Sequence, residues 1–103
     1  MVFEIEAIPG DPRKLTQTVL QITQMLDLYQ AELARMLGIK CSDIGRLANG
    51  RQCLQPNTHA WKHAVLFVRL YQLLFKRLDG DGVAMRHWLR RCDRQLDGVP
   101  HLL

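Results

Sequence analysis

The sequence predicts an all-α fold, a compact bundle of about five helices that contains a helix-turn-helix. Apolar residues recur at intervals of three and four along most of the chain, as they do on the buried face of a helix. Residues that start or stop helices separate these periodic stretches. No region is rich in strand-forming residues, and 103 residues, 48% of them hydrophobic, fit a single core.

Residues 1–10 form the expected N-terminal arm, which would dock on the body through Phe3, Ile5 and Ile8. Asp11 and Pro12 then start the first helix, with the acid at the cap and proline at the first helical position. The buried face of this helix is predicted by one apolar stripe at helical spacing: Leu15, Val19, Ile22 and Leu26.

Two short helices are expected next, over residues 30–37 and 41–48. Gly38 stops the first, and the pair Asn49 and Gly50 gives the second a left-handed end. A helix-turn-helix needs a glycine to reverse the chain and apolar residues to lock its two helices together. The chain supplies these at Leu33, Ala34, Gly38, Ile39, Ile44 and Leu47. An ordinary helical hairpin is the alternative, although it tolerates many other spacings.

A long fourth helix is expected to start at a cap on Asn57 and to end near Leu78. It carries one apolar stripe of Trp61, Ala64, Val68, Tyr71, Phe75 and Leu78, and a second of Leu66, Leu70 and Leu73. This surface is broader than one face of a small bundle needs. Either the helix is central and covered on most sides, or it also buries against a second copy, and we expect a homodimer.

The stretch DGDG breaks the long helix, and a last helix is expected to follow it. We expect this helix to end near Cys92 and to present Val83, Ala84 and Trp88 inward. The chain then divides into an arm (1–10), a helix-turn-helix domain with the long fourth helix (11–78) and a C-terminal segment (79–103).

The stretch QAELARMLGI, followed by IGRLANGR, resembles the Xre-type helix-turn-helix of phage repressors. The resemblance implies that Gln30 caps the first helix of the motif and contacts the DNA backbone. It implies that Cys41, Ser42 and Arg46 face base edges, and that Asn49 and Arg51 hold a further phosphate. Arg46 is the best candidate to read a guanine, because its guanidinium matches two acceptors there.

Two residues depart from this pattern. An acid such as Asp43 at the groove accepts from a base amino group, that of cytosine above all, or instead caps its own helix start. Gly45 inside a short helix costs about 1 kcal/mol relative to alanine. Base reading is therefore supported least by the middle of the motif, from Cys41 to Gly45.

The tail WLRRCDRQLDGVPHLL resembles the C-terminal domain of the Xre/MbcA/ParS family of bacterial antitoxins. That resemblance implies a C-terminal region that binds a RES-domain toxin, an NAD-consuming enzyme, and an N-terminal half that dimerises and represses its own operon. Asp97 replaces a glycine of the pattern, and the sequence stops at Leu103 where members usually continue, as a shortened or trimmed member would. The implied partner-binding residues are Trp88, Leu89, Arg90, Arg91, Leu96, Pro100, Leu102 and Leu103.

The charge distribution favours an acidic partner. The net charge is +4, but residues 30–94 hold twelve Lys and Arg against five acids. A nucleic acid or an acidic protein surface would suit this field, as would a solvated basic face. The sequence shows no secretory signal and no apolar run long enough for a membrane span. With only three cysteines and no close pair, we expect a protein of the reducing cytoplasm.

We expect neither catalysis nor a cofactor. His59 and His63 stand four residues apart, with Cys53 and Cys41 upstream, but the intervals match no common zinc site. The acids are scattered among Lys and Arg, and no phosphate-binding loop is present. The leading hypothesis is a transcriptional regulator that resembles these antitoxins, binds operator DNA and represses its own operon. The alternative is a protein-interaction module or inhibitor that uses its C-terminal tail and retains a vestigial helix-turn-helix.

Overall fold

A computed structural model of the chain describes the backbone of residues 2–98 and the side chains of residues 2–91. Within these residues all the regular secondary structure is helical, which confirms the expected all-α fold. The helices are α1 (Pro12–Met25), α2 (Gln30–Leu37), α3 (Cys41–Ala48), α4 (His59–Arg77) and α5 (Gly82–Gly98). None of the described helices combines the length and the apolar character needed to cross a membrane.

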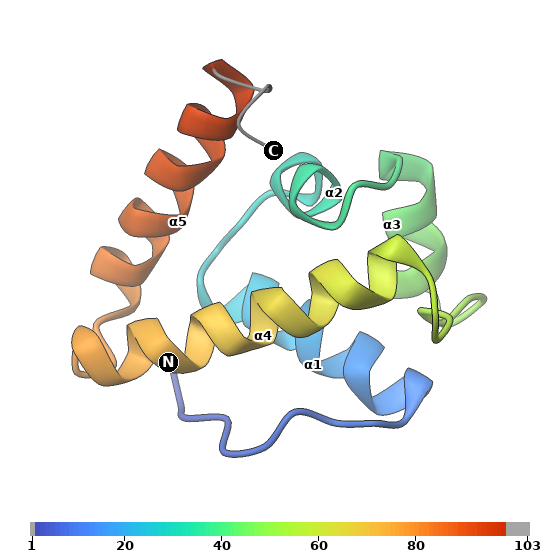
Figure 1. The fold of residues 1–103 in the computed structure, drawn as a ribbon, viewed down its shortest axis with the longest axis horizontal. Coiled ribbons are helices and arrows are strands. Elements are labelled where there is room, and N and C mark those ends of the chain that lie inside the picture. The colour runs from blue at the N-terminus through green and yellow to red at the C-terminus, as the bar shows by residue number, and fades with distance from the viewer. Residues whose placement is uncertain (1, 99–103) are drawn as a thin grey trace.

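Helix α4 runs through the centre of the molecule (Figure 1). It packs against α1, α2 and α5, while α3 is reached through α2. Its inner side is buried at Ala64, Phe67, Val68, Tyr71 and Leu74. The breadth of its apolar surface is therefore explained in large part by three neighbouring helices.

Part of the second apolar stripe of α4 nevertheless remains open. Leu66 and Leu73 are 57% and 61% exposed, and Leu70 is half-buried against the core. Leu66 and Leu73 are seven residues apart, which is about two helical turns, so they lie on one face of α4. This face is the part of α4 that its three neighbours leave uncovered.

The helix starts follow local hydrogen-bonding rules. The carboxylate of Asp11 accepts from the backbone N–H of Lys14 at 3.0 Å, as expected for the cap of α1. The cap of α4 is Thr58, whose hydroxyl accepts from the Trp61 N–H at 3.1 Å, so the expectation of Asn57 was wrong. Asn57 takes a left-handed φ of 67°, which asparagine tolerates, and this turn delivers the following residue to the cap position.

The arm docks on α4 mainly through its backbone. The Tyr71 hydroxyl donates to the carbonyl of Phe3, and the Gln72 amide donates to the carbonyl of Ile5 at 2.8 Å. Ile5 and Ile8 pack against the core as expected, together with Val2. Phe3 does not, because the carbonyl that binds Tyr71 holds its side chain on the exposed side.

Helix α5 differs from the expectation in phase and in length. Met85 and Leu89 are its buried residues, while Val83 and Trp88 are exposed and Ala84 is half-buried. Met85 and Leu89 are four residues apart and so form one narrow buried stripe along α5. Val83 and Trp88 lie outside this stripe. The helix also continues beyond Cys92 to Gly98, so the expected end near Cys92 was wrong.

Two glycines of the central motif should respond in opposite ways to alanine. Gly38 has a φ of 70°, and a Cβ there would lie 3.4 Å from the His63 ring, so Gly38→Ala should destabilise the fold by about 1–2 kcal/mol. Gly45 lies inside α3 with nothing within 4 Å of its Cβ position. Gly45→Ala should therefore stabilise it by up to about 1 kcal/mol. Urea denaturation measures both, and equal signs would contradict the assigned backbone conformations.

Candidate nucleic-acid interface

Helices α2 and α3 form the expected helix-turn-helix, joined by residues 38–40. The inner faces of the pair are buried at Leu33, Ala34, Ile44 and Leu47, and Ile39 packs against the same core. At the turn, the N–H of Ile39 donates to the carbonyl of Ala34 at 3.0 Å and that of Gly38 to the carbonyl of Arg35 at 3.3 Å. These two bonds close α2 with a left-handed glycine, which makes the sharp reversal possible.

The motif is fixed to the rest of the fold at two further points. The Nδ1 atom of His63 on α4 lies 3.1 Å from the carbonyl oxygen of Leu37, so in the tautomer with a proton on Nδ1 it donates to the end of α2. On the other side, the N–H of Leu54 donates to the hydroxyl of Thr16 on α1 at 2.9 Å. The end of α2 and the loop after α3 are therefore each tied to a neighbouring helix.

All six residues expected to contact DNA are exposed: Gln30, Cys41, Ser42, Arg46, Asn49 and Arg51. Gln30 is the first residue of α2, but it does not cap the helix as expected. The residue at the cap position is Tyr29, whose N–H donates to the Glu32 carboxylate at 2.9 Å. Glu32 performs the local capping because it is the third residue of the helix and can reach back one turn.

The exposed face of α3 contains an arginine that is partly held in place. The guanidinium of Arg46 lies 3.6 Å from the carboxylate of Asp43, with the side chains 61% and 31% exposed. Asp43 lies in the first turn of α3, where the helix dipole favours a negative charge, whereas the cap position is Lys40. Asp43, the acid that departs from the expected base-reading pattern, thus contacts Arg46, the residue expected to read a guanine.

The end of α3 orients the loop that follows. The N–H of Arg51 donates to the carbonyl of Arg46 at 3.1 Å, and the N–H of Gly50 to that of Leu47 at 3.2 Å. Gly50 has a φ of 75°, so the left-handed helix end expected from the sequence is present. This end directs Asn49 and Arg51 outward at the terminus of α3.

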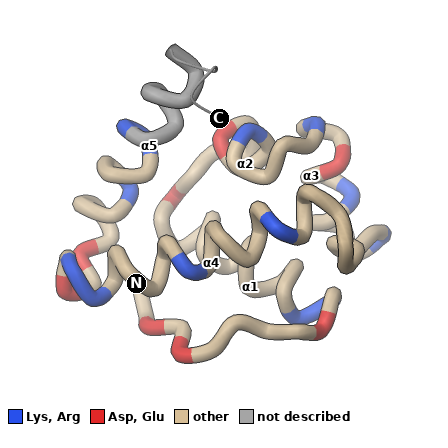
Figure 2. The backbone as a smooth tube through the Cα atoms, in the orientation of Figure 1, with Lys and Arg blue, Asp and Glu red and all other residues tan. Residues whose placement is uncertain are grey.

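Positive charge follows the motif along the chain. Lys and Arg positions occur on α2, in the turn, on α3 and in the loop after it (Figure 2). These cations are Arg35, Lys40, Arg46 and Arg51, all exposed. Arg13 of α1 lines the same shallow groove as Gly50 and Gln52, which adds a cation beside the end of α3. The arrangement gives this part of the surface a positive field suited to phosphates.

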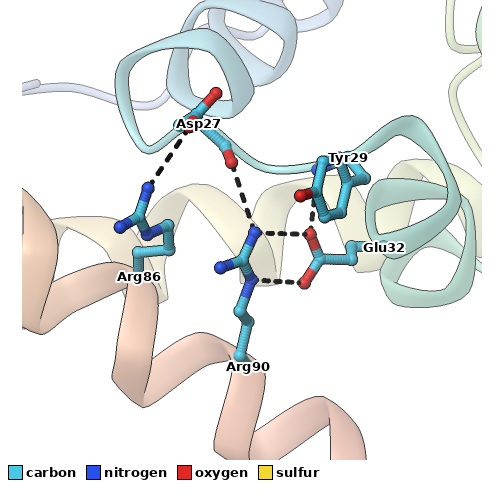
Figure 3. Close-up of polar contacts among 5 residues, drawn as sticks. All are labelled: Asp27, Tyr29, Glu32, Arg86 and Arg90. Atoms are coloured by element: carbon cyan, nitrogen blue, oxygen red, sulfur yellow. Dashed lines mark hydrogen bonds and ion pairs between the residues drawn. The ribbon is translucent and has the colours of Figure 1, made fainter.

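A second polar group of residues, not expected from the sequence, joins α5 to the start of α2 (Figure 3). The carboxylate of Glu32 accepts from the Nε of Arg90 at 2.9 Å and from its Nη2 at 3.3 Å. The same Nη2 lies 3.4 Å from the carbonyl of Asp27, and the guanidinium stands 5.2 Å from the centre of the Tyr29 ring. Arg86 adds an ion pair of 3.3 Å with the exposed carboxylate of Asp27. We call the residues Asp27, Tyr29, Glu32, Arg86 and Arg90 the α2–α5 clamp.

The electrostatics of the clamp centre on Glu32, whose side chain is only 9% exposed. Burial by itself raises the pKa of Glu32, but the Arg90 hydrogen bonds, the Tyr29 N–H and the charges of Arg90 and Arg35 outweigh it and leave the pKa below 4.5. The pKa of Arg90 is raised in turn by its hydrogen bond to Glu32.

The position of Glu32, three residues after the cap residue Tyr29, was a capping signal available in the sequence. Their pairing with Arg90, 58 residues away, was not.

The residues expected to bind a protein partner are divided by the fold. Trp88 is 44% exposed and Arg91 is exposed, so both are accessible on α5. Leu89 fills the core, and Arg90 is engaged in the clamp. The side chain of Leu96 and the whole of Pro100, Leu102 and Leu103 lie outside the described residues.

Metal-ligating side chains do not gather anywhere in the part of the chain whose side chains are described. His59 and His63 lie on α4, and His63 bonds the end of α2 instead. Cys41 is exposed and Cys53 half-buried, and both are free thiols.

The comparisons with known proteins add no assignment to this geometry. No protein-family model matches the chain, and no curated protein matches its sequence significantly.

The lowered pKa of Glu32 predicts a specific pH dependence of stability. Because the folded pKa lies below 4.5, the carboxylate stabilises the fold fully above that pH and loses this contribution as the pH falls below it. Glu32→Gln keeps the capping acceptor but removes the charge, so it should cost on the order of 1 kcal/mol at pH 7. The difference between the two proteins should shrink from about pH 4.5 downward. Urea denaturation at a series of pH values tests this, and a pH-independent difference would contradict it.

Proposed function

We propose that this protein is a DNA-binding transcriptional regulator of the cytoplasm that binds operator DNA and represses its own operon. The observation that supports this most is the exposure of α3. One side of α3 is locked in the core by Ile44 and Leu47, while Ser42 and Arg46 face outward. A helix presented in this way can enter the major groove, which is about 12 Å wide. No catalytic step is part of the proposal.

Base reading would rest mainly on Arg46. Its guanidinium can donate two parallel hydrogen bonds to the O6 and N7 acceptors of a guanine. Asp43 limits the rotamers of the free arginine, so less side-chain freedom would be lost on binding. Ser42 and Cys41 would contact base edges more weakly.

Phosphate contacts would set the register of the motif on the duplex. Gln30 stands at the N-terminus of α2, and Asn49 and Arg51 stand at the end of α3. Backbone contacts of this kind supply affinity without sequence preference and make it salt-dependent. The positive field around α3 would speed and strengthen the encounter.

The proposal includes a homodimer, because one recognition helix reads only a half-site and paired helices read two. Leu66 and Leu73 on α4 are the exposed apolar residues that support a contact between copies. Two copies of α3 separated by about one helical turn, roughly 34–36 Å, would fit a palindromic operator.

Arg46→Ala should weaken binding to the preferred operator by about 1–3 kcal/mol and relax the preference at one base pair. The preferred sequence is first selected from a random duplex pool, with the promoter fragment of the gene alongside. Fluorescence anisotropy at 50 and 200 mM salt should show a steep loss of affinity with salt for the wild type.

Lys76→Ala is the matched control, since Lys76 is an exposed cation at the far end of α4. It should change affinity little and leave the sequence preference intact. Selection of no preferred sequence, or equal effects of the two substitutions, would remove the proposed role of α3.

A second candidate function is supported by α5. Trp88 and Val83 are exposed on this helix, and large apolar side chains on a surface often mark protein contacts. By the resemblance of the tail to Xre/MbcA/ParS antitoxins, the partner would be a RES-domain toxin or another protein that α5 neutralises or inhibits. This function can accompany DNA binding or stand alone with a vestigial helix-turn-helix.

Trp88→Ala tests this second function. The substitution should leave the urea midpoint nearly unchanged, because the side chain is 44% exposed, yet weaken binding to a co-expressed toxin encoded beside this gene. Affinity purification and calorimetry with that toxin measure the effect, with Arg77→Ala as a control on the surface of α4. Unchanged toxin binding by the Trp88 variant would rule out this use of α5.

A further inference from the structure

The clamp places a buried negative charge directly behind the end of α2 that the proposed function turns toward DNA. Glu32 is the third residue of α2, and Gln30, the expected phosphate contact, is the first. A carboxylate so close to a phosphate would repel it, because two like charges within about a Debye length, roughly 10 Å, are incompletely screened. Burial makes the screening weaker still.

Arg90 is placed to cancel this charge. Its Nε donates to Oε2 of Glu32 and its Nη2 to Oε1, and the Nη2 also donates to the carbonyl of Asp27 in the link between α1 and α2. Figure 3 shows Arg86 and Arg90 projecting from α5 toward this link and the first turn of α2. Arg90 also stacks over the ring of Tyr29, which holds the cap residue of α2.

We infer that Arg90 of α5 is a positioning residue for the DNA site, which acts by neutralising Glu32 at the N-terminus of α2 rather than by touching DNA. The inference rests on the proposed function and adds an element to it. The DNA site then extends beyond the helix-turn-helix and includes the attachment of α5. An event that draws Arg90 away from Glu32, such as capture of α5 by a partner, lowers the affinity for DNA through the uncovered carboxylate.

Charge rescue tests this inference. Binding to the selected operator duplex is measured by fluorescence anisotropy at 50 mM salt for the wild type and three variants: Arg90→Gln, Glu32→Gln and the double variant. Arg90→Gln should weaken binding about tenfold, because it leaves the carboxylate unpaired. Glu32→Gln should bind at least as tightly as the wild type, and the double variant should recover most of the loss.

Two controls separate this mechanism from the alternatives. Lys76→Gln changes the net charge equally but lies in a groove between α4 and the arm, outside the clamp, and should alter affinity less than about twofold. Urea midpoints of all variants follow folding separately. If Arg90 only held α5 in place, the double variant would bind no better than Arg90→Gln, and this result would overturn the inference.

The failure of the inference is distinguishable from that of the proposed function. A wild type that binds no duplex, or binds all sequences alike without dependence on Arg46, removes the proposed function and the inference with it. A wild type that binds its operator through Arg46, with Arg90→Gln equal to Lys76→Gln, removes the inference alone.

Discussion

Burial of one side of α4 is the constraint on which the other elements depend. The neighbours of α4 reach it by two kinds of contact. Helices α1 and α2 contribute apolar faces, α5 contributes Met85 and Leu89, and the arm contributes backbone carbonyls to Tyr71 and Gln72. Without α4 the eight-residue helices α2 and α3 would be too short to persist in water. The exposed face of α3 therefore owes its position to contacts made well away from it.

The parts of this fold that could be predicted from sequence are those determined within one or two turns. Asp11 before Pro12, Gly38 after Leu37 and Gly50 after α3 all behave as local rules require. The failures have physical causes as well. Thr58 caps α4 in place of the expected Asn57, because Asn57 takes a left-handed conformation in the turn before the helix. Val83, Ala84 and Trp88 were expected on the inward face of α5, but the packing of α5 against α4 and α2 buries Met85 and Leu89, and the sequence of one helix does not state how it docks on another.

The candidate site divides along the same line. The exposed positions of α3 follow from helical periodicity, since Ile44 and Leu47 fix which side is buried. The clamp does not follow from periodicity, because it joins Glu32 of α2 to Arg90 of α5, and a local sequence pattern does not predict which helices pack together. The two parts would have complementary roles. In the proposed function, the helix-turn-helix would supply the surface that contacts DNA, and the clamp would set the charge behind it.

The docking of the arm by its backbone carries a practical consequence. Tyr71 and Gln72 bind main-chain carbonyls, so the arm is held by its path more than by its side chains. Its first described residue, Val2, comes so close to Gly82 that a Cβ on Gly82 would lie 2.6 Å from it. The start of the arm thus lies at the junction of α4 and α5, at the opposite end of α4 from α3 (Figure 1). An affinity tag joined ahead of Val2 would emerge beside the first turn of α5 and leave α3 unobstructed.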